Sequence, residues 1–158
     1  MQSDRSYDLV MAAFVATLLI SNIASSAKII DWGVSFLGLP LSFDAGTLLF
    51  PISYIFGDIL TEVYGYVPAR RVIWTGFFLS AFMSLYLWLV GAMPGEAQWL
   101  QHAGDDAYAA ILGGVSSGGI IIASLSAYLL GELSNARTMV VIKKLTHGRF
   151  LWMRTIGS

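Results

Sequence analysis

The sequence predicts an all-α fold, a polytopic bundle of transmembrane helices, and three observations support this. The chain of 158 residues is 56% hydrophobic and only 12% charged, whereas soluble domains have about 25% charged residues. Its mean hydropathy is +0.70. The apolar residues form long runs, and about 20 of them suffice to cross a bilayer. So few charges cannot cover a water-facing surface, so we expect lipid as the solvent and residues 1–158 as a single integral membrane domain.

Composition argues against several classes of function. The net charge of −1 disfavours nucleic acid as a partner. The chain has no cysteine, so disulfides, thiolate metal sites and cysteine nucleophiles are excluded. Its two histidines, His102 and His147, fall in predicted loops, which disfavours a multi-histidine metal site. With no nucleophile–histidine pair and no G-x-S-x-G pattern, we predict no catalytic residue, no metal and no cofactor, and a function that is not enzymatic.

The first span is expected over residues 9–27. The preceding residues include Asp4 and Asp8, and the apolar run is too long for a signal peptide, so we interpret it as a retained span. Polar residues recur along one face of its second half, namely Thr17, Ser21, Asn22, Ser25 and Ser26. Two interpretations stay open: the hydroxyls bond to backbone or pack against a neighbour, or Asn22 lines a cavity.

Residues 32–43 are an apolar connector that we expect in the membrane interface or dipping back into the protein. Asp44 is a good N-cap for the second span, residues 44–64. Pro51 stands in its middle and cannot donate to the preceding turn, which predicts a kink there. Kinked or broken helices expose backbone polar groups at the binding sites of transporters, although many proline kinks have no ligand.

Two further spans follow. Residues 72–93, rich in large aromatic side chains, predict a lipid-facing or packing helix. Residues 107–141 predict a long span broken at the glycine cluster 113–119. Beyond the break, a small-residue seam predicts helix packing and a neighbouring polar line predicts a cavity wall. The seam is Gly119, Ala123, Ala127, Gly131 and Asn135, and the polar line is Ser124, Tyr128 and Glu132.

After the fourth span we expect a basic loop, and residues 150–156 resemble the start of a fifth span. The basic residues of this loop are Arg137, Lys143, Lys144, His147, Arg149 and Arg154. We therefore expect about four spans and the start of a fifth, in a sequence that is truncated at its C-terminus. Basic residues set the orientation. Those near the N-terminus, after the second span and after the fourth share one side, whereas Lys28 lies on the other. This predicts a cytoplasmic N-terminus.

Asp58 and Glu62 are the unusual feature of the second span, because charges inside a membrane are costly. Four residues apart, they should share one helical face. Three interpretations compete. Arginines pair with them, either Arg70 or Arg71 nearby or Arg137 and Arg154 from elsewhere. An acid accepts hydrogen bonds from the N–H edge of a polar heterocycle. An acid takes up a proton during transport.

Three stretches resemble one known family. Residues 50–74, FPISYIFGDILTEVYGYVPARRVIW, are similar to the signature of the queuosine precursor transporter family, also called the vitamin uptake transporter family. Residues 21–28, SNIASSAK, resemble its first span. Residues 132–158 resemble the stretch that leads into its fifth span. The resemblance implies an inner-membrane protein of six spans that imports 7-cyano-7-deazaguanine or a related 7-deazaguanine for queuosine synthesis in tRNA.

The resemblance also implies a set of substrate-binding or coupling residues: Asn22, Lys28, Asp58, Glu62, Tyr64, Arg70, Arg71, Asn135 and Arg154. A 7-deazaguanine presents N1–H beside an exocyclic amine, and a carboxylate can accept both. We therefore expect Glu62 or Asp58 to recognise the base. Its O6 would accept from a donor such as Asn22, Asn135 or an arginine, and the aromatic cover would be Tyr54, Phe50 or Trp74.

Alternatives remain for function and partners. The chain lacks a Walker A pattern, so any ATP use must come from a partner. It could then be the substrate-binding membrane subunit of an importer of the energy-coupling-factor type. A membrane scaffold that associates through the Gly119–Gly131 seam is a non-transport alternative. The expected partners are a nucleobase-like small molecule, the lipid bilayer, and a second copy or an energising subunit.

Overall fold

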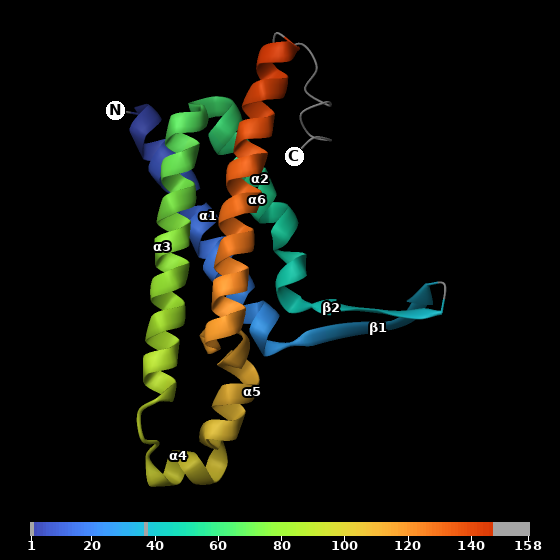
Figure 1. The fold of residues 1–158 in the computed structure, drawn as a ribbon, viewed down its shortest axis with the longest axis vertical. Coiled ribbons are helices and arrows are strands. Elements are labelled where there is room, and N and C mark those ends of the chain that lie inside the picture. The colour runs from blue at the N-terminus through green and yellow to red at the C-terminus, as the bar shows by residue number, and fades with distance from the viewer. Residues whose placement is uncertain (1, 37, 147–158) are drawn as a thin grey trace.

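The computed structural model describes residues 2–36 and 38–146 (Figure 1). In chain order its elements are α1 (Gln2–Ala27), β1 (Ile29–Phe36), β2 (Leu39–Asp44), the 3₁₀ turn η1 (Ala45–Leu48), α2 (Phe50–Ile59), the π-helical turn η2 (Leu60–Tyr64), α3 (Tyr66–Gly91), α4 (Ala97–His102), α5 (Gly104–Ser116) and α6 (Gly118–Leu145). Helices α1, α3 and α6 run along the long axis of the bundle, and the β-hairpin projects from its side.

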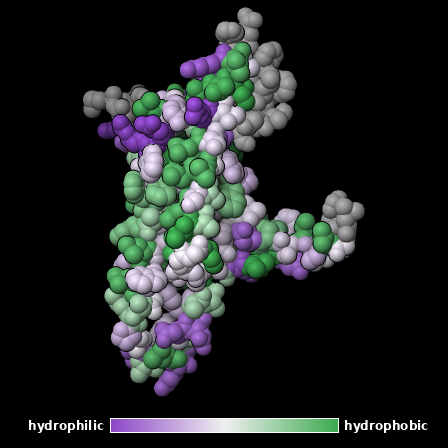
Figure 2. Space-filling model, in the orientation of Figure 1, coloured by the Kyte–Doolittle hydropathy of each residue, from purple (hydrophilic) through white to green (hydrophobic). Residues whose placement is uncertain are grey.

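Three helical segments of the described chain are long and apolar enough to cross a membrane: Arg5–Ala27, Tyr66–Gly91 and Gly104–Leu145. This confirms the predicted bundle of apolar helices. Hydrophilic residues gather at the two ends of the bundle and near the base of the hairpin, whereas the middle is largely apolar (Figure 2). Large side chains such as Phe78 and Phe82 of α3 are more than 60% exposed. An apolar exterior of this kind suits lipid rather than water.

The core lies where α1, η2 and α3 meet. Phe14 of α1, Leu60 of η2 and Val72 of α3 are each at most 2% exposed and belong to one cluster of buried side chains. Tyr7 of α1 donates to the Pro68 carbonyl at 3.1 Å, which joins the start of α1 to the start of α3. The core thus fixes one end of the bundle, and it does not fill the space beside α2 and α6.

The segment between α1 and η1 corrects the expectation that the apolar connector dips back into the protein, whereas its place in the membrane interface stays a prediction. It forms an antiparallel hairpin that points away from the bundle instead of dipping into it (Figure 1). Most residues of β1 are β-branched or aromatic, which favours a strand. Trp32 packs edge-to-face on Phe43 with ring centroids 5.0 Å apart. Gly38 occupies the turn with φ 81°, a backbone conformation that favours glycine. Irregular pairing near Gly33 interrupts the ladder.

The second predicted span is divided, and this corrects the expected kink at Pro51. Residues 44–64 form η1, α2 and η2 rather than one continuous helix. Pro51 stands in the first turn of α2, where its missing N–H costs no helical hydrogen bond. The predicted cap is confirmed, because Asp44 accepts from the Thr47 backbone N–H at 3.0 Å. The cap begins a 3₁₀ turn, so the break precedes the proline.

Close contact between α1 and η1 sets the position of α2. Ser21 of α1 donates to the Gly46 carbonyl at 3.0 Å, and Ser25 donates to the Asp44 carboxylate at 2.5 Å. The Ala45 N–H donates to the Lys28 carbonyl at 2.9 Å. These two serine hydroxyls therefore join α1 to the following turn, which agrees with the packing interpretation for them.

The predicted break in the fourth span is confirmed, because Ser117 is extended between α5 and α6. The loop assignments of His102 and of the first residues of the expected basic loop were wrong. His102 ends the short helix α4, which Glu96 caps through the Trp99 N–H at 2.9 Å, and Arg137, Lys143 and Lys144 belong to α6. Other predictions fall outside the described residues: His147, Arg149, Arg154 and the start of a fifth span at 150–156.

Gly46→Ala should destabilise the protein, because the added Cβ would overlap Ser25 Oγ and the Ser21 carbonyl and would lie 2.9 Å from Ser21 Oγ. Overpacking of this kind costs about 1–3 kcal/mol. Thermal unfolding in detergent measures the loss. Gly119→Ala is the matched control, since its Cβ would meet nothing within 4 Å. An equal melting temperature for the two variants would contradict the close contact.

Asp44, which lies outside the three candidate spans, predicts a pH dependence. The hydrogen bond from Ser25, with smaller contributions from Thr47 and Gly46, holds the pKa of Asp44 below its ordinary value of 3.8. The stabilisation is therefore complete above the unfolded-state pKa and is lost as the pH falls through the lower folded-state pKa. We expect the melting temperature to fall from about pH 5 downward. The melting temperature of the Asp44→Asn variant should fall less steeply with decreasing pH. Parallel curves for the variant and the wild-type protein would exclude this contribution of Asp44.

Candidate functional site

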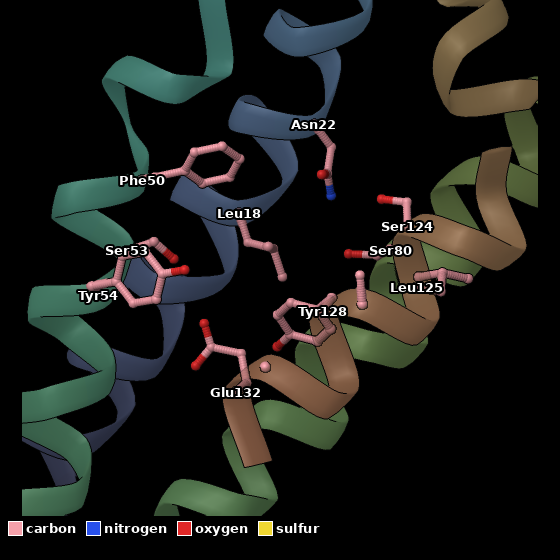
Figure 3. A pocket seen from close by; sticks show the side chains of 12 residues that line it. Leu18, Asn22, Phe50, Ser53, Tyr54, Ser80, Ser124, Leu125, Tyr128 and Glu132 are labelled. Carbon is pink, nitrogen blue, oxygen red and sulfur yellow. The ribbon is translucent and has the colours of Figure 1, made fainter. Parts of the chain in front are cut away.

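A cavity of about 290 Å³ lies between α1, α2, α3 and α6 (Figure 3). Its wall combines aromatic, aliphatic and polar side chains, which is typical of small-molecule sites. The lining residues are Leu18 and Asn22 of α1; Phe50, Ser53 and Tyr54 of α2; Ser80 of α3; and Ser124, Leu125, Ala127, Tyr128, Gly131 and Glu132 of α6.

The polar line of α6 faces this cavity, as its spacing predicts. Ser124, Tyr128 and Glu132 all line it, and their side chains project from successive turns of one helix (Figure 3). Tyr128 donates from its hydroxyl to the Ile73 carbonyl at 3.1 Å, which fixes the ring as part of the wall. Gly76 makes this possible, because a Cβ there would lie 2.6 Å from the Tyr128 hydroxyl.

Among the described residues, Glu132 is the one carboxylate that lines the cavity. Its Oε2 would lie 3.5 Å from a Cβ built on Gly57, so the carboxylate lies against α2 beside Asp58. Asn135 is within hydrogen-bonding reach of Asp58. Even so, Asp58 Oδ1 and Asn135 Oδ1 are buried without a partner among the described residues. Two neighbouring carboxylates in a poorly solvated site repel each other, and N–H donors from a ligand would relieve that repulsion.

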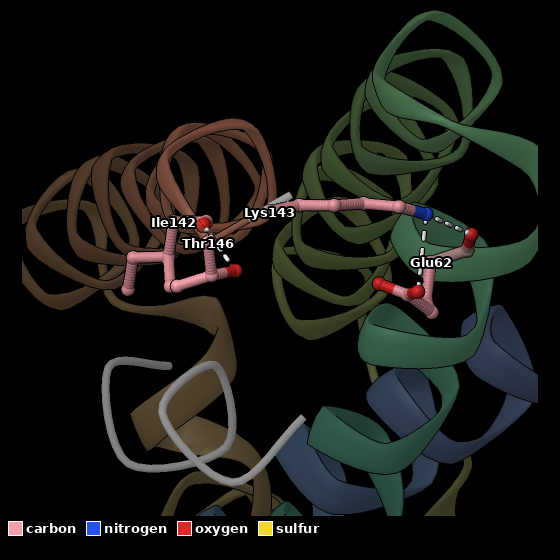
Figure 4. Close-up of polar contacts among 4 residues, drawn as sticks. All are labelled: Glu62, Ile142, Lys143 and Thr146. Atoms are coloured by element: carbon pink, nitrogen blue, oxygen red, sulfur yellow. Dashed lines mark hydrogen bonds and ion pairs between the residues drawn. The ribbon is translucent and has the colours of Figure 1, made fainter. Parts of the chain in front are cut away.

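Asp58 and Glu62 both approach α6, at different positions along it. Lys143 of α6 lies 3.0 Å from Glu62 Oε1 and donates to the Glu62 backbone carbonyl at 3.1 Å (Figure 4). Asp58 is close to Glu132, whereas Glu62 contacts the end of α6.

The remaining predicted site residues lie in different environments. Asn22 lines the cavity. Tyr64 packs edge-to-face on Tyr7, with ring centroids 5.2 Å apart. Lys28, Arg70 and Arg71 are exposed and outside the cavity lining. Arg154 lies outside the described residues. Roles for these residues in binding or coupling stay predictions.

Two of the three expected aromatic residues belong to the cavity wall. Phe50 and Tyr54 line it from α2. Trp74 instead stacks on Phe78 of its own helix, with ring centroids 5.7 Å apart. The small-residue seam of α6 also differs from expectation: Ala127 and Gly131 line the cavity, and a Cβ at Gly119 or Gly131 would meet nothing within 4 Å. In the described chain these two glycines are not at a close helix contact.

The sequence placed Glu132 on the predicted cavity wall, at the end of the polar line, but we did not assign it a substrate-binding role. Ser53 and Ser80 were not predicted to line a cavity. Ser53 and Ser80 are single serines in apolar helices, and a single serine has no periodicity that marks it. Both are buried and line the cavity.

The contact between Lys143 and Glu62 should make a small contribution to stability. Its side chains are 44% and 30% exposed, so solvent screening limits the pair to about 0.2–1 kcal/mol. A double-mutant cycle with Lys143→Ala and Glu62→Ala, measured by unfolding in detergent, isolates the coupling energy. Lys144→Ala is the control, being adjacent and exposed. Additive losses would show that the two side chains do not interact energetically.

Comparison with known proteins agrees with this architecture. The model of a family described as "Putative vitamin uptake transporter" matches residues 44–158. No curated protein and no solved structure matches the chain. The match extends from the cap of η1 through α2, α3 and α6, and so includes three of the four helices around the cavity. Together with its long apolar helices, it identifies the chain as a multi-pass membrane protein that belongs to the vitamin uptake transporter family.

Proposed function

We propose that the protein imports a queuosine precursor, 7-cyano-7-deazaguanine or a related 7-deazaguanine, through the bacterial inner membrane, and that the cavity is its binding site. One observation carries the proposal beyond the family. Glu132 lines a cavity of suitable size, and the partly unpaired side chains of Asp58 and Asn135 lie beside it. A site with excess acceptors suits a ligand with adjacent N–H donors.

The donor edge of a 7-deazaguanine fits the Glu132 end of the cavity. Its N1–H and exocyclic amine can both donate to one carboxylate, and a charge-assisted bidentate contact is roughly twice as strong as a neutral one. Asp58 lies beside Glu132 on the facing helix and offers a further acceptor for the amine. Recognition by an acid, expected from the sequence at Glu62 or Asp58, is thus best supported at Glu132 with Asp58.

The rest of the wall suits a flat ring. Phe50, Tyr54 and Tyr128 offer aromatic faces from two opposing helices. The volume of about 290 Å³ is at the lower end of the range of small-molecule pockets, roughly 300–1,000 Å³. A two-ring base with a short substituent is a ligand of that size.

Topology supports a cytoplasmic N-terminus. The starts of α1 and α3 and the end of α6 lie at one end of the bundle (Figure 1), and they hold Arg5, Arg70, Arg71, Lys143 and Lys144. Cytoplasmic segments are enriched in such residues. The buried side chains of Leu60, Ala69 and Val72 and the Lys143–Glu62 contact separate the cavity from this end. Import would require that barrier to open, alone or with an energising subunit or a second copy.

Complementation tests the function directly. A strain unable to make queuosine precursors, and lacking its own importer, receives the gene and is supplied with 7-cyano-7-deazaguanine. Queuosine in tRNA should appear only with the gene. Absence of queuosine, despite protein in the membrane fraction, would refute the proposal. Supplying guanine in parallel controls for uptake that does not depend on the precursor.

Glu132→Gln tests the recognition acid. The substitution keeps the shape of the side chain but replaces one acceptor by a donor and removes the charge. Loss of a hydrogen bond to a charged group costs about 1.5–3 kcal/mol, so half-maximal uptake should require about ten- to a hundredfold more base. Glu96→Gln is the matched control, because Glu96 is in the loop before α4, away from the cavity. Unchanged uptake by Glu132→Gln would exclude Glu132 as the recognition acid.

A further inference from the structure

Ser80 of α3 is a buried hydroxyl without a hydrogen-bond partner. It is 3% exposed, and its Oγ has no hydrogen-bond partner among the described residues. Several other hydroxyls behave differently, since they donate to the carbonyl four residues earlier in the chain. Examples are Thr61 to Gly57 at 3.0 Å, Thr75 to Arg71 at 3.0 Å, Ser116 to Leu112 at 2.9 Å and Thr146 to Ile142 at 2.8 Å. Ser80 instead lines the cavity.

A second, smaller cavity of about 30 Å³ adjoins the first at this residue, and we call it the annex. Asn22, Ser80, Ser124 and Leu125 line both cavities, so they form the boundary between them. Beyond this boundary the annex is enclosed mainly by Met83, Ser84, Gly114, Val115 and Ile121. The annex is therefore a short extension of the main cavity with a polar entrance and a largely apolar end.

The entrance to the annex lies away from Glu132. Asn22, Ser80 and Ser124 gather on one side of the cavity, and Glu132 lies on the other side beyond Tyr128 (Figure 3). The described lining of the annex contains an amide and hydroxyls but no charged side chain. A ligand held by its donor edge at Glu132 would thus place its opposite end among neutral groups that can donate hydrogen bonds.

We propose that Asn22, Ser80 and Ser124 form a specificity subsite for a short, neutral, hydrogen-bond-accepting substituent, and that the annex limits its length. The inference rests on the proposed function, in which this group is the 7-substituent of the base. A linear nitrile accepts a hydrogen bond at its end and needs little width. At about 30 Å³, against about 290 Å³ for the main cavity, the annex suits a short substituent better than the cyclopentenediol side chain of queuine.

Charge separates the third candidate substrate. The aminomethyl group of 7-aminomethyl-7-deazaguanine is cationic at neutral pH, and no carboxylate of the described residues lines the annex. A buried charge without a counter-ion is strongly disfavoured. The subsite therefore selects 7-cyano-7-deazaguanine over both the aminomethyl base and queuine.

The test compares uptake of 7-cyano-7-deazaguanine and of 7-deazaguanine, which has no 7-substituent, in cells that express the whole protein. Ser80→Ala should raise the concentration for half-maximal uptake of the cyano base by about three- to tenfold, the value of one lost hydrogen bond. The same variant should change uptake of 7-deazaguanine by less than about twofold. Ser116→Ala, a helix serine outside both cavities, should alter neither.

Ser84→Val provides a second variant that does not touch the entrance. Ser84 lines the annex only, so a larger side chain there should shorten it. Uptake of the cyano base should fall and that of 7-deazaguanine should persist. This variant tests the subsite if the Ser80→Ala protein fails to reach the membrane.

The outcomes separate the two proposals. No uptake of either base by the wild-type protein refutes the proposed function, and the subsite with it. The subsite alone is refuted if the wild-type protein takes up both bases and the variants do not distinguish them. In that case Ser80→Ala or Ser84→Val reduces uptake of both bases equally, or reduces uptake of neither. A loss of uptake that is larger for the cyano base than for 7-deazaguanine supports the subsite.

Discussion

The contact of α1 with η1 at Gly46 is the constraint on which the cavity depends. Only a residue without a side chain allows the backbone there to approach Ser21 and Ser25. Because Ser21 donates to the Gly46 carbonyl, the turn is held against α1 immediately before α2 begins. Helix α2 then runs beside α1 and α6, so that Phe50 and Tyr54 reach the same space as Asn22. Hydrogen bonds between helices are effective in this role, because the hydrophobic effect contributes little to the association of helices in lipid.

Much of the fold could be predicted from the sequence because lipid imposes simple rules. Long apolar runs must be helical to satisfy their backbone, and this gave α1, α3 and the α5–α6 pair. Local chemistry gave the Asp44 cap and the break at Ser117. In the site, the polar line of Ser124, Tyr128 and Glu132 indicated a cavity wall because residues four apart share a helical face.

What the sequence did not predict depends on contacts between distant segments. Lys143, 81 residues away in the sequence, contacts Glu62, whereas Asp58 lies beside Glu132. The hairpin over residues 29–44 depends on pairing between strands that each resemble an apolar connector. Ser80 resembles any helix serine until the neighbouring helices show that its hydroxyl faces a cavity. Spacing within one helix contains none of this information.

The distribution of unpaired polar atoms strengthens the case that the cavity is a binding site. An unpaired buried polar group costs about 1–3 kcal/mol, and lipid offers no water to satisfy it. Three such side-chain atoms occur in the described residues: Asp58 Oδ1, Ser80 Oγ and Asn135 Oδ1. Ser80 lines the cavity, while Asp58 and Asn135 lie beside its Glu132 end. Their position around one space is what the proposed site requires, because a polar ligand bound there would supply the hydrogen bonds that the protein does not make.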